Sequence, residues 1–292
     1  MVDIRHLRYF LALAEHLHFA KAAAIVNVTQ PSLSRQIAAL EDELGCELFV
    51  RNSRSVSLTA AGLELQRSAQ KVVDSLNGAI RTTQAVARGE RGELKIAFTS
   101  MIAWTAFPTL VRRYSVQYPN VGINLTEMLP NDLIQSVRTG ESDLCLAFRT
   151  EVSQPLSYEA LQSEKLCIAL PADHPHAGKK RLNLSLLKGE PFILSPRTIA
   201  PTLHDAIMSL CHAAGFEPQV RMHTHLQGTI VNLVAEGLGV SVVPQAMAKS
   251  GMQGVAFISL PESSAMEMGI VWSQENQNPC LMGFLEIAGK PN

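Results

Sequence analysis

The apolar residues near the N-terminus recur at the spacing of a helix. The positions that repeat three or four residues apart in the first segment are Ile4, Leu7, Phe10, Leu11, Ala14 and Leu17. This period predicts a helix with one buried face. In residues 19–44 the helical pattern is interrupted at Asn27 and Val28, after which Thr29 can cap a new helix with Pro31 in its first turn. The pattern therefore predicts three helices, the last two joined by a tight turn.

The third predicted helix has one apolar face and one open polar face. The apolar residues that share a face are Leu33, Ile37, Leu40 and Leu44. The polar residues on or beside the open face are Gln30, Ser32, Ser34, Arg35 and Gln36. Side chains with such donors and acceptors read base edges or hold phosphates in a major groove. An ordinary amphipathic surface helix is the plain alternative, but the neighbouring pattern favours a helix-turn-helix.

The segment after this helix predicts a β-hairpin followed by a long helix. Residues 48–59 contain two short apolar runs separated by a polar turn with Arg51 and Arg54, as in a wing. Thr59 then begins a helix to about Arg88. Apolar and small residues repeat every seven positions in two series, Leu65, Val72, Ala79 and Val86, and Ala69, Leu76 and Thr83. This stripe predicts a dimerising linker helix; the alternative is that it packs on its own domain.

From residue 93 the pattern changes to alternating strands and helices. The strands expected in a first lobe are 94–98, 121–126 and 143–148, and its helices are 107–118 and 133–139. A second lobe is expected to hold strands 166–171, 192–194, 220–224 and 240–244 with helices 203–214 and 230–236. A strand at 268–272 returns to the first lobe, which helix 281–287 closes. The alternation predicts a largely parallel sheet that binds ligands at the carboxyl ends of its strands.

Composition limits the class of protein more than it identifies a function. A chain of 292 residues suits two domains, and 47% hydrophobic with 17% charged residues argues against long disorder. No leader sequence or run of eighteen apolar residues is present, so we expect a cytoplasmic protein with no membrane segment. Residues 1–58 hold six basic and six acidic residues. The sum is neutral, but Glu41–Glu43 fall at the far end of the third helix, away from the groove.

The cysteines and histidines predict neither a disulfide framework nor a metal centre. Five scattered cysteines in a cytosolic chain are expected to be core thiols. The pairs His174 with His176 and His223 with His225 have no Cys or carboxylate set at ligand spacing, so no metal and no cofactor are expected.

Four stretches of the chain resemble the LysR-type transcriptional regulators: HLRYFLALAEHLHFAKAA, SVSLTAAG, GELKIAF and AEGLGVSVVP. The resemblance covers essentially the whole chain. It implies a winged helix-turn-helix DNA-binding domain at 1–58 and a dimerising linker helix at 59–88. It further implies a two-lobed, periplasmic-binding-protein-like α/β effector domain at 89–292. Lobe I would span about 93–163 and 268–292, and lobe II about 164–267.

The resemblance also implies partners and DNA contacts. The positions expected to face the major groove are Gln30, Pro31, Ser32, Ser34 and Arg35, while Arg51 and Arg54 would hold phosphates or enter the minor groove. The partners would be double-stranded operator DNA, a second copy in a homodimer through the linker helix, a homotetramer, and RNA polymerase if the protein activates transcription.

Three helix starts are expected to converge on the cleft between the lobes, after Thr99–Ser100, Pro130–Asn131 and Pro201–Thr202. Free backbone N–H groups at such starts suit a carboxylate. The family's ligand-binding positions are matched by Thr99, Ser100, Thr202 and the crossover segment His225-Leu226-Gln227, and the expected apolar walls are Met101, Met128 and Phe148. Pro130 departs from the family, in which Ser or Thr is common there, so this lobe offers one hydroxyl fewer. In the alternative, Ser100 and Thr202 only cap their own helices.

Two functions from different classes are open to such a chain. One is a DNA-binding regulator that responds to a small organic anion in the cleft. The other is an enzyme or solute-binding protein on the same two-lobed fold, with the N-terminal segment as an interaction module. The sequence has no GxSxG, HExxH, P-loop or dinucleotide-binding glycine pattern. Together with the N-terminal reader, this favours a regulator that is not an enzyme.

Overall fold

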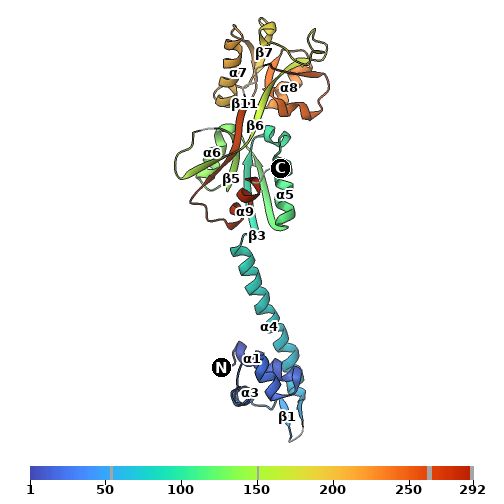
Figure 1. Ribbon diagram of the computed structural model, residues 1–292, viewed down its shortest axis with the longest axis vertical. Helices are drawn as coiled ribbons and strands as arrows, with labels where there is room; N and C mark the ends of the chain where they lie inside the picture. Colours follow the sequence, from blue (N-terminus) through green and yellow to red (C-terminus); the bar gives the residue numbers. More distant parts are fainter. Residues whose placement is uncertain (53–54, 150, 262–264, 290–292) are drawn as a thin grey trace. The chain divides into compact units, whose positions relative to one another are not determined.

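The chain folds into two compact units, residues 1–85 and 86–292 (Figure 1). The structure, a computed structural model, describes residues 1–52, 55–149, 151–261 and 265–289. Within these ranges, no helix is both long enough and apolar enough to cross a membrane.

The N-terminal unit begins with the three helices that the apolar period predicts. They are α1 (Ile4–His16), α2 (Phe19–Ile25) and α3 (Gln30–Leu44). Their core includes the fully buried side chains of Phe10, Leu13 and Leu33. Leu17 and Leu44 were wrongly predicted to be buried, because each is 41% exposed. Leu17 lies past the end of α1 in the left-handed region at φ 48°, so its side chain leaves the helical face.

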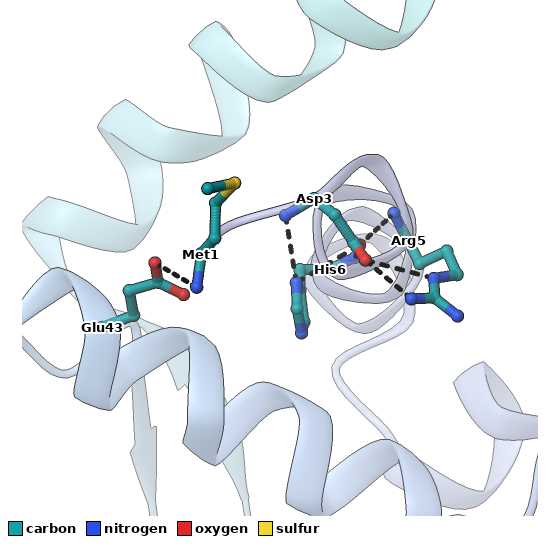
Figure 2. Close-up of polar contacts among 5 residues, drawn as sticks. All are labelled: Met1, Asp3, Arg5, His6 and Glu43. Atoms are coloured by element: carbon teal, nitrogen blue, oxygen red, sulfur yellow. Dashed lines mark hydrogen bonds and ion pairs between the residues drawn. The ribbon is translucent and has the colours of Figure 1, made fainter.

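The start of α1 is fixed by polar contacts that Figure 2 shows. The Asp3 carboxylate accepts hydrogen bonds from the backbone N–H groups of Arg5 and His6, and Nδ1 of His6 accepts from the Asp3 N–H. The Arg5 guanidinium, with these N–H groups, lowers the pKa of Asp3 to about 2. The Met1 amino group pairs with the Glu43 carboxylate at 2.6 Å, which ties the N-terminus to the end of α3.

The predicted wing and linker helix follow. Strands β1 (Phe49–Arg51) and β2 (Val56–Leu58) pair antiparallel. The predicted DNA contact Arg54 lies outside the described residues. Helix α4 (Ala60–Ala87) starts where Oγ1 of Thr59 accepts from the Gly62 N–H at 3.0 Å.

The predicted stripe on α4 divides into two parts. Ala69 is 1% exposed, and with Leu65 it packs against the core of α1 to α3, as the alternative interpretation expected. Farther along, Val72 and Val86 are 50% and 45% exposed, and they have no such cover. The second half of the stripe is therefore the part that remains free for a partner.

The C-terminal unit is built on one sheet that runs through two lobes. The strands of its first lobe are β3 (Arg91–Phe98), β4 (Asn120–Glu127) and β5 (Leu144–Phe148). The strands that continue into the second lobe are β6 (Leu156–Pro171) and β11 (Ala265–Ser273). The order is β10-β6-β11-β5-β3-β4, and β9 also pairs with β6. The second lobe adds β9 (Ser241–Pro244) and β10 (Val255–Ser259) to this sheet, and its β7 (Pro191–Leu194) and β8 (Gln219–His223) form a separate two-stranded sheet.

The prediction of a largely parallel sheet was wrong. Strand β3 pairs parallel with β4 and β5, and β7 pairs parallel with β8. However, β11 is antiparallel to both β5 and β6, and β6 is antiparallel to β9 and β10. The sequence analysis started β6 at Leu166 because its first ten residues are mixed in polarity, and it missed β10 altogether.

Helices cover both lobes. Those of the first lobe are α5 (Phe107–Gln117), α6 (Pro130–Arg138), α9 (Pro279–Ala288) and the 3₁₀ helix η1 (Ser100–Trp104). Those of the second lobe are α7 (Pro201–Ala213), α8 (Gln227–Ala235) and the 3₁₀ helices η2 (Leu184–Leu187) and η3 (Gln245–Ser250). In Figure 1, α7 and α8 group with β7, while α5, α6 and α9 surround β3 and β5. The first predicted helix start is thus a five-residue 3₁₀ helix, and the other two begin α-helices.

Four of the five cysteines are buried in the C-terminal unit, and Cys46 is exposed. Burial raises the pKa of the Cys145 and Cys167 thiols to about 12, and that of Cys211 to about 11. These thiols are therefore protonated at neutral pH and act as small apolar side chains.

Gly62 in the first turn of α4 should not tolerate a side chain. A Cβ atom there would collide with the carbonyl oxygen of Leu48 and lie 2.9 Å from Cδ2 of Leu58, at the base of the wing. We expect Gly62→Ala to lower the free energy of unfolding of the N-terminal unit by about 1–3 kcal/mol.

Gly78 in the same helix is the matched control for this measurement. Its nearest neighbour would be the Arg81 side chain at 4.0 Å, so Gly78→Ala should raise stability by up to about 1 kcal/mol. Denaturant unfolding of both variants tests the pair. Equal effects at the two positions would contradict the close packing of α4 on the wing.

Candidate functional site

The predicted reading face lies at the start of α3. Gln30, Pro31 and Arg35 are exposed, and Ser32 and Ser34 are half-buried on the same end of the helix. Thr29 occupies the N-cap position in extended conformation, but its side chain makes no capping hydrogen bond. The first-turn N–H groups are therefore without a side-chain acceptor, and such helix starts bind phosphate groups. That these residues contact DNA remains a prediction.

Arg51 and Glu41 join the wing to α3. Oε1 of Glu41 accepts from the backbone N–H groups of Leu48 at 2.8 Å and Phe49 at 3.1 Å. Its other oxygen forms an ion pair with the Arg51 guanidinium, which lies 5.4 Å from the centroid of the Phe19 ring. Sequence reasoning missed this role, because it counted Glu41 only as an acid distant from the groove. The guanidinium that was predicted to hold DNA thus also holds the wing on the helices.

A cavity of about 490 Å³ lies in the C-terminal unit between residues of both lobes. All the predicted effector-binding residues line it: Thr99, Ser100, Met101, Met128, Phe148, Thr202, His225 and Gln227. Lining residues that the sequence analysis did not single out include Glu127, Leu129, Ile134, Ala200 and Leu203. The structure thus brings the predicted residues together, while their binding of an effector stays a prediction.

Three α-helices begin at the cavity without a side-chain cap. The N-cap residues of α6, α7 and α8 are Leu129, Ala200 and Leu226, and none provides a capping hydrogen bond. All three residues line the cavity. Uncapped first turns leave backbone N–H groups in need of an acceptor and carry the positive end of the helix dipole. These helix starts therefore present partial positive charge to the cavity without a cationic side chain.

Polar side chains at the cavity are also left without partners. In the described part of the chain, the hydroxyls of Thr99, Ser100 and Thr202 form no hydrogen bond with protein. The alternative in which Ser100 and Thr202 only cap their own helices is therefore wrong, since neither does so. These hydroxyls are free to donate to a bound molecule.

The two lobes meet at this cavity through few polar contacts. The side-chain amide of Asn131, in the first turn of α6, donates to the carbonyl oxygen of Thr198 in the second lobe. Within the second lobe, Nε2 of Gln227 donates to Oγ of Ser195 at 2.9 Å. The ionisable residues among those that line the cavity are Glu127 and His225, both exposed, with no Lys or Arg beside them. Among the described residues, no cluster of three or more His, Cys, Asp or Glu could hold a metal ion.

A helix-turn-helix unit with a wing, joined by a long helix to a two-lobed domain with a ligand-sized cavity, defines a class of ligand-responsive DNA-binding regulators. Comparison with known proteins agrees. The model of the bacterial regulatory helix-turn-helix protein, lysR family, matches residues 4–63, and that of the LysR substrate binding domain matches residues 87–290. The chain belongs to the LysR family of DNA-binding transcriptional regulators, and these are not enzymes.

Individual relatives are similar along their whole length. The chain is 33% identical to the uncharacterized regulator YnfL of Escherichia coli over 97% of this chain and 96% of that protein. It is 32% identical to the regulator IlvR of Caulobacter vibrioides over 98% and 97%. The crystal structure of the LysR family regulator CbnR matches with a TM-score of 0.88 and 26% identity, covering 98% of this chain and all of that one. The structure of CbnR with its target DNA matches with a TM-score of 0.82, 25% identity and 98% coverage of both chains.

The contacts of Glu41 lead us to predict that removing this acid weakens DNA binding. Removing an acidic residue from a DNA-binding unit should normally strengthen binding, because the unit becomes more positive. We expect Glu41→Ala to weaken it by about 1–3 kcal/mol, since two N–H groups lose their acceptor and the wing loses its anchor.

Asp42→Ala is the control, because Asp42 is an exposed acid at the same end of α3. Fluorescence anisotropy with DNA retained by the wild-type protein compares the two variants. If Glu41→Ala binds as well as Asp42→Ala, the junction does not position the wing.

Proposed function

We propose that this regulator changes its binding to operator DNA when a small organic anion occupies the cavity between its lobes. The observation that carries the proposal is the convergence of three uncapped helix starts, those of α6, α7 and α8, on one cavity. Helix starts favour anions by about 0.3–1 kcal/mol each at exposed sites, and more where water is excluded. The hydroxyls of Thr99, Ser100 and Thr202 supply further donors.

The apolar side chains that line the rest of the cavity limit which anions fit. Met101, Met128 and Phe148 line the cavity together with Ile134 and Leu203, so most of its surface is apolar. A cavity of about 490 Å³ is within the usual range for small-molecule sites. An aromatic or short-chain carboxylic acid fits both features: the carboxylate lies at the helix starts and the carbon skeleton lies against the apolar walls.

On DNA, the start of α3 would enter the major groove with Gln30, Pro31, Ser32, Ser34 and Arg35. The uncapped first turn of α3 supports this orientation, because its N–H groups can bind a phosphate. Arg51 and Arg54 of the wing would contact the DNA backbone or the minor groove. If the protein activates transcription, RNA polymerase is a further partner.

One reader contacts only a few base pairs, so two must be held about one turn of DNA apart. The free half of the α4 stripe is the surface that we assign to a homodimer. Its exposed apolar residues include Val72 and Val86, which are 50% and 45% exposed. Dimers would pair into homotetramers through the C-terminal units.

The effector prediction is tested by thermal unfolding of the full chain with a panel of metabolite acids. We expect at least one acid to raise Tm, and we expect Ser100→Ala and Thr202→Ala each to weaken its binding about tenfold, because a hydrogen bond to a charged group is lost. Ser209→Ala, in the same helix as Thr202 but bonded to the Asp205 carbonyl, is the control. Stabilisation that survives both substitutions undiminished would place the anion elsewhere.

The assembly prediction is tested by sedimentation. Leu76→Asp puts a charge in the middle of the proposed seam, and we expect a monomer that binds operator DNA poorly. Gln84→Asp adds the same charge to an exposed position of α4 away from the seam and should leave the assembly intact. A Leu76→Asp protein that sediments as the wild-type oligomer would show that α4 is not the dimer interface.

A further inference from the structure

Gln227 lines the cavity and carries a buried, unpaired acceptor. It is the first residue of α8, and it is only 8% exposed. Its Nε2 donates to Oγ of Ser195 at 2.9 Å, while its Oε1 is buried and has no hydrogen-bond partner. Leaving such an atom unpaired is unfavourable, so buried polar atoms without partners are rare in folded proteins.

The amide is held by its surroundings. The backbone oxygen of Ser195, the residue that accepts from Gln227, is itself within 2.9 Å of Nδ1 of His204. One of the two N–H groups of Nε2 is directed at Ser195, which fixes the orientation of the amide. The free oxygen can only accept a hydrogen bond.

The other polar groups of the cavity are of two opposite kinds. The helix starts and the hydroxyls of Thr99, Ser100 and Thr202 offer donors, whereas Glu127 at the end of β4 offers a carboxylate. A plain carboxylate would satisfy the donors and leave Gln227 Oε1 without a partner. A molecule that carries an anionic end and a donor satisfies both kinds.

From this we infer that the effector is a carboxylic acid that also carries an N–H or O–H donor, an amino acid or a hydroxy acid, and that Gln227 accepts from this donor. The inference rests on the proposed anion site and adds that this site prefers acids with a second, donor group. Glu127 distinguishes the two sources of the donor, because a carboxylate attracts an ammonium group and gains much less from a neutral hydroxyl.

The test uses acids that share one carbon skeleton. Leucine, 2-hydroxy-4-methylpentanoate and 4-methylpentanoate form one set, and phenylalanine, 3-phenyllactate and 3-phenylpropionate form another. Calorimetric titration of the full chain measures Kd for each. In at least one set, we expect a donor-bearing acid to bind about tenfold or more tightly than the plain acid, the ratio that one satisfied hydrogen bond gives.

Gln227→Met keeps the length of the side chain and removes the amide. The variant should bind the plain acid as the wild type does, which shows that the anion site is folded, and it should lose the preference for the donor-bearing acid. If the donor is an ammonium group, Glu127→Gln should weaken binding of the amino acid and leave binding of the other acids unchanged. If the donor is a hydroxyl, the hydroxy acid should bind equally well to the wild type and to Glu127→Gln.

The outcomes separate this inference from the proposed function. Plain acids that bind as tightly as their donor-bearing partners, with Thr202→Ala still weakening them, would overturn the inference and leave the anion site in place. A preference that persists in Gln227→Met would also overturn it. If no acid of either set binds, both this inference and the acid class proposed for the cavity are wrong.

Discussion

The backbone N–H groups in the first turn of a helix have no partner within the helix, and both candidate sites of this protein depend on where these groups are left free. Elsewhere the chain supplies acceptors: Asp3 for α1, Thr59 for α4 and Asn278 for α9. The side chains at the N-cap positions of α3, α6, α7 and α8 supply none. A missing cap costs about 0.5–2 kcal/mol of stability. Proline in the first turn of α3, α6 and α7 reduces that cost by removing one N–H, and a bound phosphate or carboxylate can pair with the others.

The N-terminal unit shows why counting charges says little about a reader of DNA. Its predicted sum of zero treats every acid as a repulsive charge. The Glu41 carboxylate, however, accepts from two backbone N–H groups of the wing and pairs with Arg51. Asp3 caps the first helix, and Glu43 pairs with the N-terminal amino group. These acids act within the unit, by fixing the geometry on which groove contacts depend. The basic residues and the free helix start of α3 are what the unit presents outward.

How much could be predicted from the sequence follows from how local each interaction is. The three N-terminal helices and the wing were predicted well, because apolar period and turn chemistry are decided by neighbours along the chain. The prediction that Leu17 and Leu44 are buried was wrong, because both residues lie where a helix ends and the backbone turns away from the core. The antiparallel pairing of β6 and β11 depends on contacts a hundred residues apart, which no local pattern reveals. The eight predicted cavity residues came from helix-start chemistry and family resemblance. Glu127 and the missing caps were not found, since Leu129, Ala200 and Leu226 carry no polar signal to notice.

The sheet restricts how an event in the cavity can reach the reader. Strands β6 and β11 pass through both lobes, and Glu164 of β6 lies opposite Met266 of β11. The buried Glu164 carboxylate accepts from the Ala246 N–H at 2.6 Å, which joins β6 to η3. Burial raises the pKa of this carboxyl, while the Ala246 N–H and Lys249 oppose the rise. The chain leaves α4 only three residues before β3, the strand between β4 and β5 in the first lobe. In that short connection Gly89, at φ 67°, is buried so closely against the Pro279 carbonyl at the start of α9 that a Cβ atom would collide with it. The residue Gly89 is therefore part of the packed C-terminal unit. Within one chain, the covalent path from the cavity to α4 therefore runs through β3 of the first lobe.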